Sequence, residues 1–300
     1  MTTPRIPRLL TAVLGLALSG LAAAAPRDFQ GLAIEVRGEG RPVLMIPGLN
    51  SPAEVWDTTC AALQADGVAC HVVQLPGFAG LAPLADGSDE AGFLVPMRDR
   101  LLAYVADAGL EQPAVMGHSL GGVLGLMMAI ESPQAVGPLL IVDSLPFFPA
   151  AMNAQATEET MRPMAESMRT GMRSQSDEAY VAQARVQAGM GMSSDAGHTA
   201  RIQDWSAASD RETTTRAMFD MFSTDLRPQL GKVRSPTLVL GAWAAYASMG
   251  STLDSTRGIF EAQYANLKDV RIEMSQGGYH FLMFDDLDWL LGQVRSHLKL

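Results

Sequence analysis

Residues 113–122 read PAVMGHSLGG, and this stretch decides which fold the chain can adopt. Ser119 stands between Gly117 and Gly121, after the short apolar run AVM and before the apolar run LGGVLGLMMAI. A Gly-x-Ser-x-Gly match alone is weak, but a strand, a glycine-rich turn and a helix are together the context of a nucleophile elbow. We predict that Ser119 is a nucleophile, with the backbone N–H of Leu120 and the helix dipole facing a developing oxyanion. The alternative is a glycine-rich turn with a capping serine.

Apolar runs with strand character alternate with helical periodicity on both sides of this stretch. Strands are expected at 32–36, 43–48, 70–74, 114–116, 139–142, 237–240 and 270–273, and helices at 53–64, 90–108, 120–130 and 289–298. This alternation predicts an α/β protein with a mostly parallel sheet covered by helices on both faces. From about 147 to 227 no strand is expected, and half of the chain's 18 methionines lie there. Such flexible side chains suit a surface that repacks on apolar ligands, or ordinary packing of a small helical subdomain.

The motif GHSLGG, with VLMIPGLN at 43–50 before it and GGYHF at 277–281 after it, resembles the α/β-hydrolase superfamily, in particular its secreted bacterial esterase-like serine hydrolases. The resemblance spans roughly residues 32–298. It implies an α/β-hydrolase core at 25–146 and 228–300, with a helical cap at 147–227 inserted after the sixth strand. It also implies a second oxyanion donor after the Pro-Gly turn, which falls on the backbone N–H of Leu49. Otherwise this Pro-Gly pair is simply a turn.

The base that activates a serine is expected late in the chain. His280 follows an apolar strand and two glycines, which matches the late histidine turn of the family. An imidazole suits this role because its unperturbed pKa lies near neutrality. His118, next to the nucleophile, is expected to be structural or to line the substrate pocket. Asp285 and Asp286 are expected to cap the last helix.

The acid that orients the base is not where the family usually carries it. From 241 to 253, after the strand that follows the helical segment, there is no Asp or Glu. Asp143 directly follows the strand before that segment, where some branches of the superfamily carry their acid. Its task would be to accept one ring N–H and stabilise the imidazolium. Asp254 is the second candidate, and an incomplete triad is the third possibility.

A serine nucleophile with a histidine base suits acyl transfer through an acyl-enzyme. The leading hypothesis is a secreted serine hydrolase that cleaves a small-molecule carboxylic ester carrying an apolar group, with Asn50, Phe147 and Phe148 beside the substrate. Other bonds remain open: amide, thioester, lactone or carbon–carbon. A different class is a ligand- or partner-binding module that kept the fold and lost efficient catalysis. Neither a metal nor a cofactor is expected, because no ligand cluster or nucleotide loop is visible.

Composition and the first residues limit the partners and the compartment. A net charge of −10 argues against nucleic acid as a partner. Residues 1–24 combine two arginines, an apolar run and a small-residue end, which predicts a cleaved signal peptide and export to the periplasm or medium, without stable membrane insertion afterwards. Cys60 and Cys70 could then form a disulfide or remain as two buried thiols. The oligomeric state is left open.

Overall fold

The computed structural model describes residues 26–85 and 87–300, so the predicted signal peptide lies outside the described residues. Its centre is an eight-stranded sheet with the order β1-β2-β4-β3-β5-β6-β7-β8. The strands are β1 (Arg27–Phe29), β2 (Leu32–Arg37), β3 (Arg41–Ile46), β4 (Val68–Gln74), β5 (Ala114–His118), β6 (Leu139–Val142), β7 (Thr237–Gly241) and β8 (Val270–Met274). β1 and β2 pair antiparallel, β2 pairs antiparallel with β4, and all pairs from β4 to β8 are parallel. The chain therefore has the mostly parallel sheet that its alternating pattern predicts.

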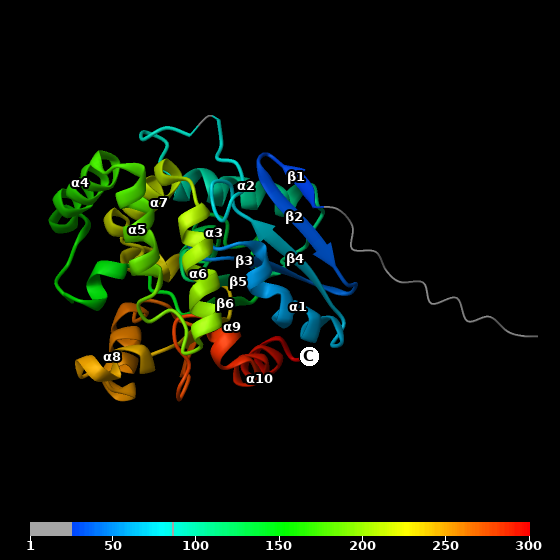
Figure 1. Ribbon diagram of the computed structural model, residues 1–300. Coiled ribbons are helices and arrows are strands. Elements are labelled where there is room, and N and C mark those ends of the chain that lie inside the picture. Colours follow the sequence, from blue (N-terminus) through cyan, green and yellow to red (C-terminus); the bar gives the residue numbers. More distant parts are fainter. Residues whose placement is uncertain (1–25, 86) are drawn as a thin grey trace, which may run out of the picture.

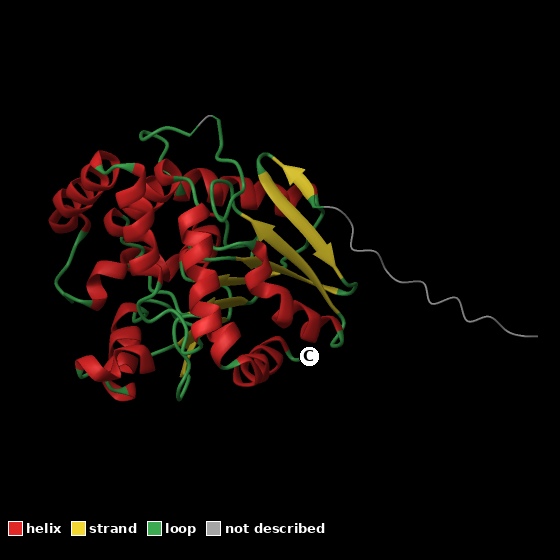
Figure 2. Ribbon diagram, in the orientation of Figure 1, coloured by secondary structure: helices red, strands yellow, loops and turns green. Residues whose placement is uncertain are grey.

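Helices cover both faces of this sheet (Figures 1 and 2). They are α1 (Asp57–Gln64), α2 (Leu94–Asp107), α3 (Leu120–Glu131), α8 (Leu253–Gln263), α9 (Leu282–Asp285) and α10 (Leu287–Leu298). Short 3₁₀ turns lie at Ala53–Trp56, Phe148–Ala151, Arg227–Lys232 and Ala244–Met249. α2 packs on α3, and α1 packs on α10.

The strands are buried on both sides, and β3 shows how. Leu44 and Ile46 join the core under α2 and α3, whereas Val43 and Met45 join the core under α1 and α10. All four side chains are completely buried. Successive strand residues point to opposite faces, so a continuous apolar run is what a doubly covered sheet requires. This double anchoring fixes the carboxyl ends of the strands, where the candidate site lies.

Between β6 and β7 the described chain forms helices only, as its pattern predicts. They are α4 (Glu158–Ser174), α5 (Asp177–Ala188), α6 (Ala196–Ala208) and α7 (Arg211–Ser223), with α4 packed on α7 and α5 on α6. Each begins at a residue whose side chain accepts an N–H three residues later, at 2.8–3.2 Å: Thr157, Ser176, Asp195 and Asp210. In Figure 1, α4 lies at the left of the view, far from β1 and β2 at the right.

Two local features differ from, or go beyond, the pattern. α2 begins at Leu94 rather than at residue 90, because Gly92 has φ 66°, a left-handed conformation that a right-handed helix cannot contain. β1 was not expected, since three residues at the sheet edge are too short to show a period.

Cys60 of α1 and Cys70 of β4 form a disulfide, with Cα atoms 6.0 Å apart. Their separation lies in the usual range for such a bond. Of the helices in residues 26–85 and 87–300, none is long and apolar enough to cross a membrane.

Candidate active site

Ser119 occupies a strained turn between β5 and α3. Its φ of 51° and ψ of −120° lie outside the regions that side chains usually adopt. The turn is held because the N–H of Ser119 donates to the carbonyl of Val142 at 3.0 Å, while the Ser119 carbonyl accepts from Gly122 at 2.8 Å. Strain that the surrounding structure maintains is common at functional sites. Ser119 is partly exposed, although the residues on either side are completely buried.

The glycines around Ser119 are required by close backbone approach. A Cβ on Gly117 would lie 2.1 Å from the carbonyl oxygen of Gly121. A Cβ on Gly121 would lie 2.3 Å from the carbonyl oxygen of Ile46. Real Cβ atoms essentially never come so close, so both positions exclude any side chain. The elbow is thus packed directly on the end of β3.

This packing brings the turn after β3 next to Ser119. A Cβ on Gly48 would lie 3.2 Å from the Cβ of Ser119. The backbone N–H groups of Leu49 and Leu120 donate no hydrogen bond to any part of the chain that the structure describes. Leu120 is the first residue of α3, where an N–H has no partner within the helix. Two free donors therefore lie beside Ser119, one from each turn.

His280 and Asp143 are in direct contact. The Nδ1 of His280 donates to Oδ2 of Asp143 at 2.6 Å. The other carboxylate oxygen, Oδ1, accepts the backbone N–H of Ala242 at 2.8 Å. Asp143 has φ 43°, and its own N–H donates to the carbonyl of Leu240 at 2.7 Å. The tips of β6 and β7 together hold this carboxylate toward the imidazole, which leaves Nε2 of His280 as the nitrogen available to a nucleophile. Asp254, the second candidate for the acid, is exposed in the first turn of α8.

His118 connects the elbow to the histidine loop. Its Nε2 donates to the carbonyl of His280 at 3.1 Å, and the two rings lie 4.6 Å apart. The residue before Ser119 thus contacts His280 directly. The hydroxyl of Ser119 makes no hydrogen bond of 3.5 Å or less with any described residue. Such contacts are often loose without substrate and tighten in the reacting complex.

Burial keeps His118 neutral. The side chain is fully buried, which lowers its pKa well below 6.5, and a charge on His280 would lower it further. Its Nδ1 is buried without a hydrogen-bond partner among the described residues. Because Nε2 carries the proton in this contact, Nδ1 carries only a lone pair.

The helical segment is tied to the histidine loop through Asp285. One carboxylate oxygen accepts from the Ser193 hydroxyl at 2.6 Å, and the other accepts from the N–H of Ser194 at 2.8 Å and of Tyr279 at 3.1 Å. The N–H of Phe281 also donates to the carbonyl of Met192 at 2.9 Å. The loop that carries the imidazole is therefore fixed to residues between α5 and α6.

The expectation that Asp285 and Asp286 cap the last helix holds only for the position of Asp286, the N-cap residue of α10, because no side-chain capping hydrogen bond forms there. Asp286 stands at the N-terminus of α10, but its carboxylate accepts from the Ser275 hydroxyl at 2.6 Å rather than from the helix. Asp285 joins the two segments just described. A prediction of capping uses only residues that are neighbours in the sequence, whereas Ser193, which donates to Asp285, lies 92 residues away.

The other residues predicted to contact substrate lie in different environments. Asn50 is buried. Its side-chain amide donates to the hydroxyl of Ser206 in α6 at 3.2 Å and accepts from the hydroxyl of Thr214 in α7 at 2.7 Å. Phe147 is 1% exposed, with its ring under Arg227, whereas Phe148 is 44% exposed and packs on Phe222. Asn50 therefore links the turn after β3 to α6 and α7, and Phe148 is the more accessible of the two aromatic rings.

The doubly covered parallel sheet, with a serine at a strained strand-to-helix turn, defines the class to which this chain belongs. A model of the alpha/beta hydrolase family matches residues 43–292, and the chain belongs to that family.

Individual relatives agree with the family. The chain is 34% identical over 113 residues to a pimeloyl-[acyl-carrier protein] methyl ester esterase of Vibrio parahaemolyticus, a match that covers 38% of this chain and 40% of that protein. The similarity thus spans less than half of that relative's length. Among solved structures, a hydrolase from Pseudomonas aeruginosa aligns with a TM-score of 0.72 at 17% identity, covering 90% of this chain and 94% of the other. An esterase from Exiguobacterium antarcticum aligns with a TM-score of 0.71 at 14% identity, covering 90% and 96%. These two structures support the fold alone, and the family model assigns the chain to the alpha/beta hydrolase family.

Proposed function

We propose that the protein is a serine hydrolase that cleaves a small-molecule carboxylic ester. Ser119 attacks the ester carbonyl while His280 takes the hydroxyl proton, and the N–H groups of Leu49 and Leu120 stabilise the oxyanion. The protonated His280 then gives its proton to the leaving alcohol, and an acyl-enzyme remains on Ser119. Water, activated by the same imidazole, releases the carboxylic acid. Asp143 fixes the tautomer of His280 and stabilises its protonated form.

The observation that carries this proposal is the 2.6 Å contact between Asp143 and His280. A carboxylate at the tip of β6 contacts the ring although the loop after β7 carries no acid. This arrangement removes the main reason for a binding module without catalysis, which was the vacant acid position. The ester-cleaving relative is consistent with the same chemistry, although the similarity covers only part of it.

An apolar group on the substrate is proposed from the helical segment, which would act as a cap over the site. Met152, Met164 and Met190 are 89%, 52% and 60% exposed there. Exposed methionines adapt their shape to apolar ligands at little cost. Export is proposed as well, because the signal-like pattern at 1–24 accompanies a disulfide between Cys60 and Cys70.

Labelling with a fluorophosphonate probe tests the nucleophile. The wild type is expected to be labelled, and Ser119→Ala is expected to lose the label completely. A panel of esters, amides, thioesters and lactones of increasing acyl length then identifies the bond. A wild type that is neither labelled nor active on any member of the panel would contradict the proposal and favour a binding module.

A further inference from the structure

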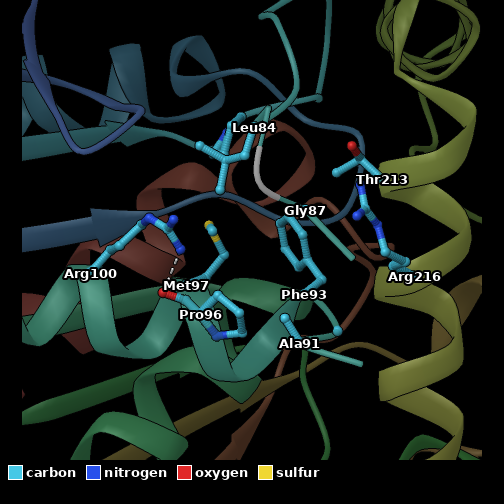
Figure 3. A pocket seen from close by; sticks show the side chains of 11 residues that line it. Leu84, Gly87, Ala91, Phe93, Pro96, Met97, Arg100, Thr213 and Arg216 are labelled. Atoms are coloured by element: carbon cyan, nitrogen blue, oxygen red, sulfur yellow. Dashed lines mark hydrogen bonds between the residues drawn. The ribbon is translucent and has the colours of Figure 1, made fainter. Parts of the chain in front are cut away.

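A cavity of about 130 Å³ lies outside the candidate active site, between α2, α7 and the loop that follows β4 (Figure 3). Its apolar wall includes Pro76, Phe93 and Met97, and its polar lining consists of Arg100, Thr213 and Arg216. A single water needs only about 10–15 Å³, so this space can hold a small organic molecule. None of its lining residues is Ser119, His280 or Asp143.

Arg216 is a buried cation that forms no hydrogen bond or ion pair with any residue in 26–85 and 87–300. Its side chain extends from α7 toward the segment that carries Gly87, and the residue is only 8% exposed (Figure 3). Its Nε has no hydrogen-bond partner, and no carboxylate among the described residues lies within 4.0 Å of the guanidinium. A buried guanidinium is costly unless it is paired, and Asp89 and Asp220 offset the charge of Arg216 only from a distance, without a direct contact.

Two acidic side chains among the described residues interact electrostatically with Arg216, and both already accept hydrogen bonds from other groups. Asp89 accepts from Arg173 at 2.8 Å and lies 3.6 Å from Arg169. Asp220 accepts the backbone N–H groups of Phe93 and Leu94 at 2.6 and 2.9 Å. Both influence Arg216 only through space. An incoming anion would therefore not have to displace an existing ion pair.

The shape of the cavity restricts what the anion can be. A Cβ on Gly87 would lie 2.4 Å from Nη1 of Arg216, so one edge of the guanidinium is closed by the chain itself. The hydroxyl of Thr213 donates to Asp210 at 2.6 Å and is not free to donate to a ligand. Arg100 also lines the cavity, but its guanidinium already donates to the carbonyls of Gln30 and Pro96, at 3.1 and 3.4 Å. The guanidinium of Arg216 is therefore the one that faces the apolar wall without a hydrogen bond to any described residue. A planar guanidinium pairs with a carboxylate through two parallel hydrogen bonds, and the wall suits a short alkyl chain.

We propose that this cavity binds a short-chain carboxylate, with its oxygens on Arg216 and its alkyl chain against Phe93 and Met97. The site is separate from the triad, but the same helix reaches the oxyanion turn, because Thr214 donates to Asn50 at 2.7 Å. Occupancy of the cavity would stabilise α7 where it supports that turn.

Titration calorimetry and thermal unfolding of the full chain test this proposal with sodium butyrate as the probe. Sodium chloride at equal ionic strength is the salt control, and inorganic phosphate is the second anion. Butyrate is expected to raise Tm in a saturable manner, whereas chloride is not. Arg216→Gln should weaken butyrate binding by about tenfold or more, the scale of a lost charged hydrogen bond. Arg234→Gln, which changes an exposed arginine between α7 and β7, is the matched control and should bind as the wild type does.

Three outcomes would overturn the proposal. They are equal effects of butyrate and chloride on the wild type, butyrate binding that Arg216→Gln retains, and binding of phosphate without binding of butyrate. If Arg216→Gln does not fold, Gly87→Ala provides the same test, because its methyl group displaces the guanidinium. Butyrate should then bind more weakly to Gly87→Ala, and unchanged affinity would exclude this cavity as the site.

Discussion

The backbone N–H of Ala242 donates to the carboxylate of Asp143 at 2.8 Å. Ala242 follows β7, and the loop that begins there is where most relatives of this fold would carry the acid. In this chain that loop supplies a hydrogen-bond donor instead, and the carboxylate comes from the end of the neighbouring strand β6. If Asp143 is the acid, as we propose, the loop after β7 contributes a donor to the carboxylate instead of carrying the carboxylate itself, and the carboxylate still contacts His280.

The first prediction concerns this carboxylate. Asp143→Asn should lower kcat/KM for an ester substrate by roughly 10⁴-fold, because an amide at this place favours the wrong tautomer of the histidine. Steady-state kinetics, with the rate of fluorophosphonate labelling, measure the effect. Asp254→Asn is the matched control, since Asp254 is exposed in the first turn of α8, and it should remain within about twofold of the wild type, as surface substitutions do. A large loss in Asp254→Asn with little loss in Asp143→Asn would reverse the assignment.

The sequence predicts the elbow, the alternating elements and the position of His280, because each depends on spacing over a few residues. Asp143 could be proposed only because the loop after β7 has no acid, and its contact with His280 joins residues 137 positions apart. The donor role of Ala242 could not be predicted, because every residue except proline carries a backbone N–H and the residue type therefore does not indicate it. The bridging role of Asp285 was missed for a related reason. Its partners Ser193 and Tyr279 come from two segments that meet only in the folded chain.

The second prediction concerns the packing under Ser119. Gly121→Ala should destabilise the protein by roughly 1–3 kcal/mol or more, because its methyl group would overlap the backbone carbonyl of Ile46. Urea unfolding followed by circular dichroism measures the change. Gly258→Ala in α8 is the control, since a methyl group there meets no atom within 4 Å. The free energy of unfolding of that variant should rise by about 0.5–1 kcal/mol, because alanine has the higher helix propensity. An equal fall in the free energy of unfolding of both variants would contradict the role assigned to Gly121.

The third prediction concerns the link between the helical segment and the histidine loop. Asp285→Asn should lower kcat by about tenfold, the scale of one lost hydrogen bond to a charged group, because an amide cannot accept all three hydrogen bonds of the carboxylate. The dependence of kcat on pH, measured from about pH 5 to 9, should also change, because the loop that holds His280 becomes less fixed. Asp288→Asn, an exposed position in the first turn of α10, is the matched control. A pH profile that stays unchanged in Asp285→Asn while Tm falls would indicate a purely structural role.

The fourth prediction concerns stability in acid. Burial lowers the pKa of His118 well below 6.5, whereas in the unfolded chain this group titrates normally. Below about pH 6.5 the unfolded state therefore binds a proton that the folded state does not, and the free energy of unfolding falls as the pH is lowered. Burial shifts the pKa of His71 in the same direction, which adds to the effect. Urea unfolding at pH 7.5, 6.5 and 5.5 should show this decline, and His118→Asn should make it shallower even if that variant is less stable throughout. An equally steep decline in His118→Asn would mean that this imidazole does not contribute to the loss of stability in acid.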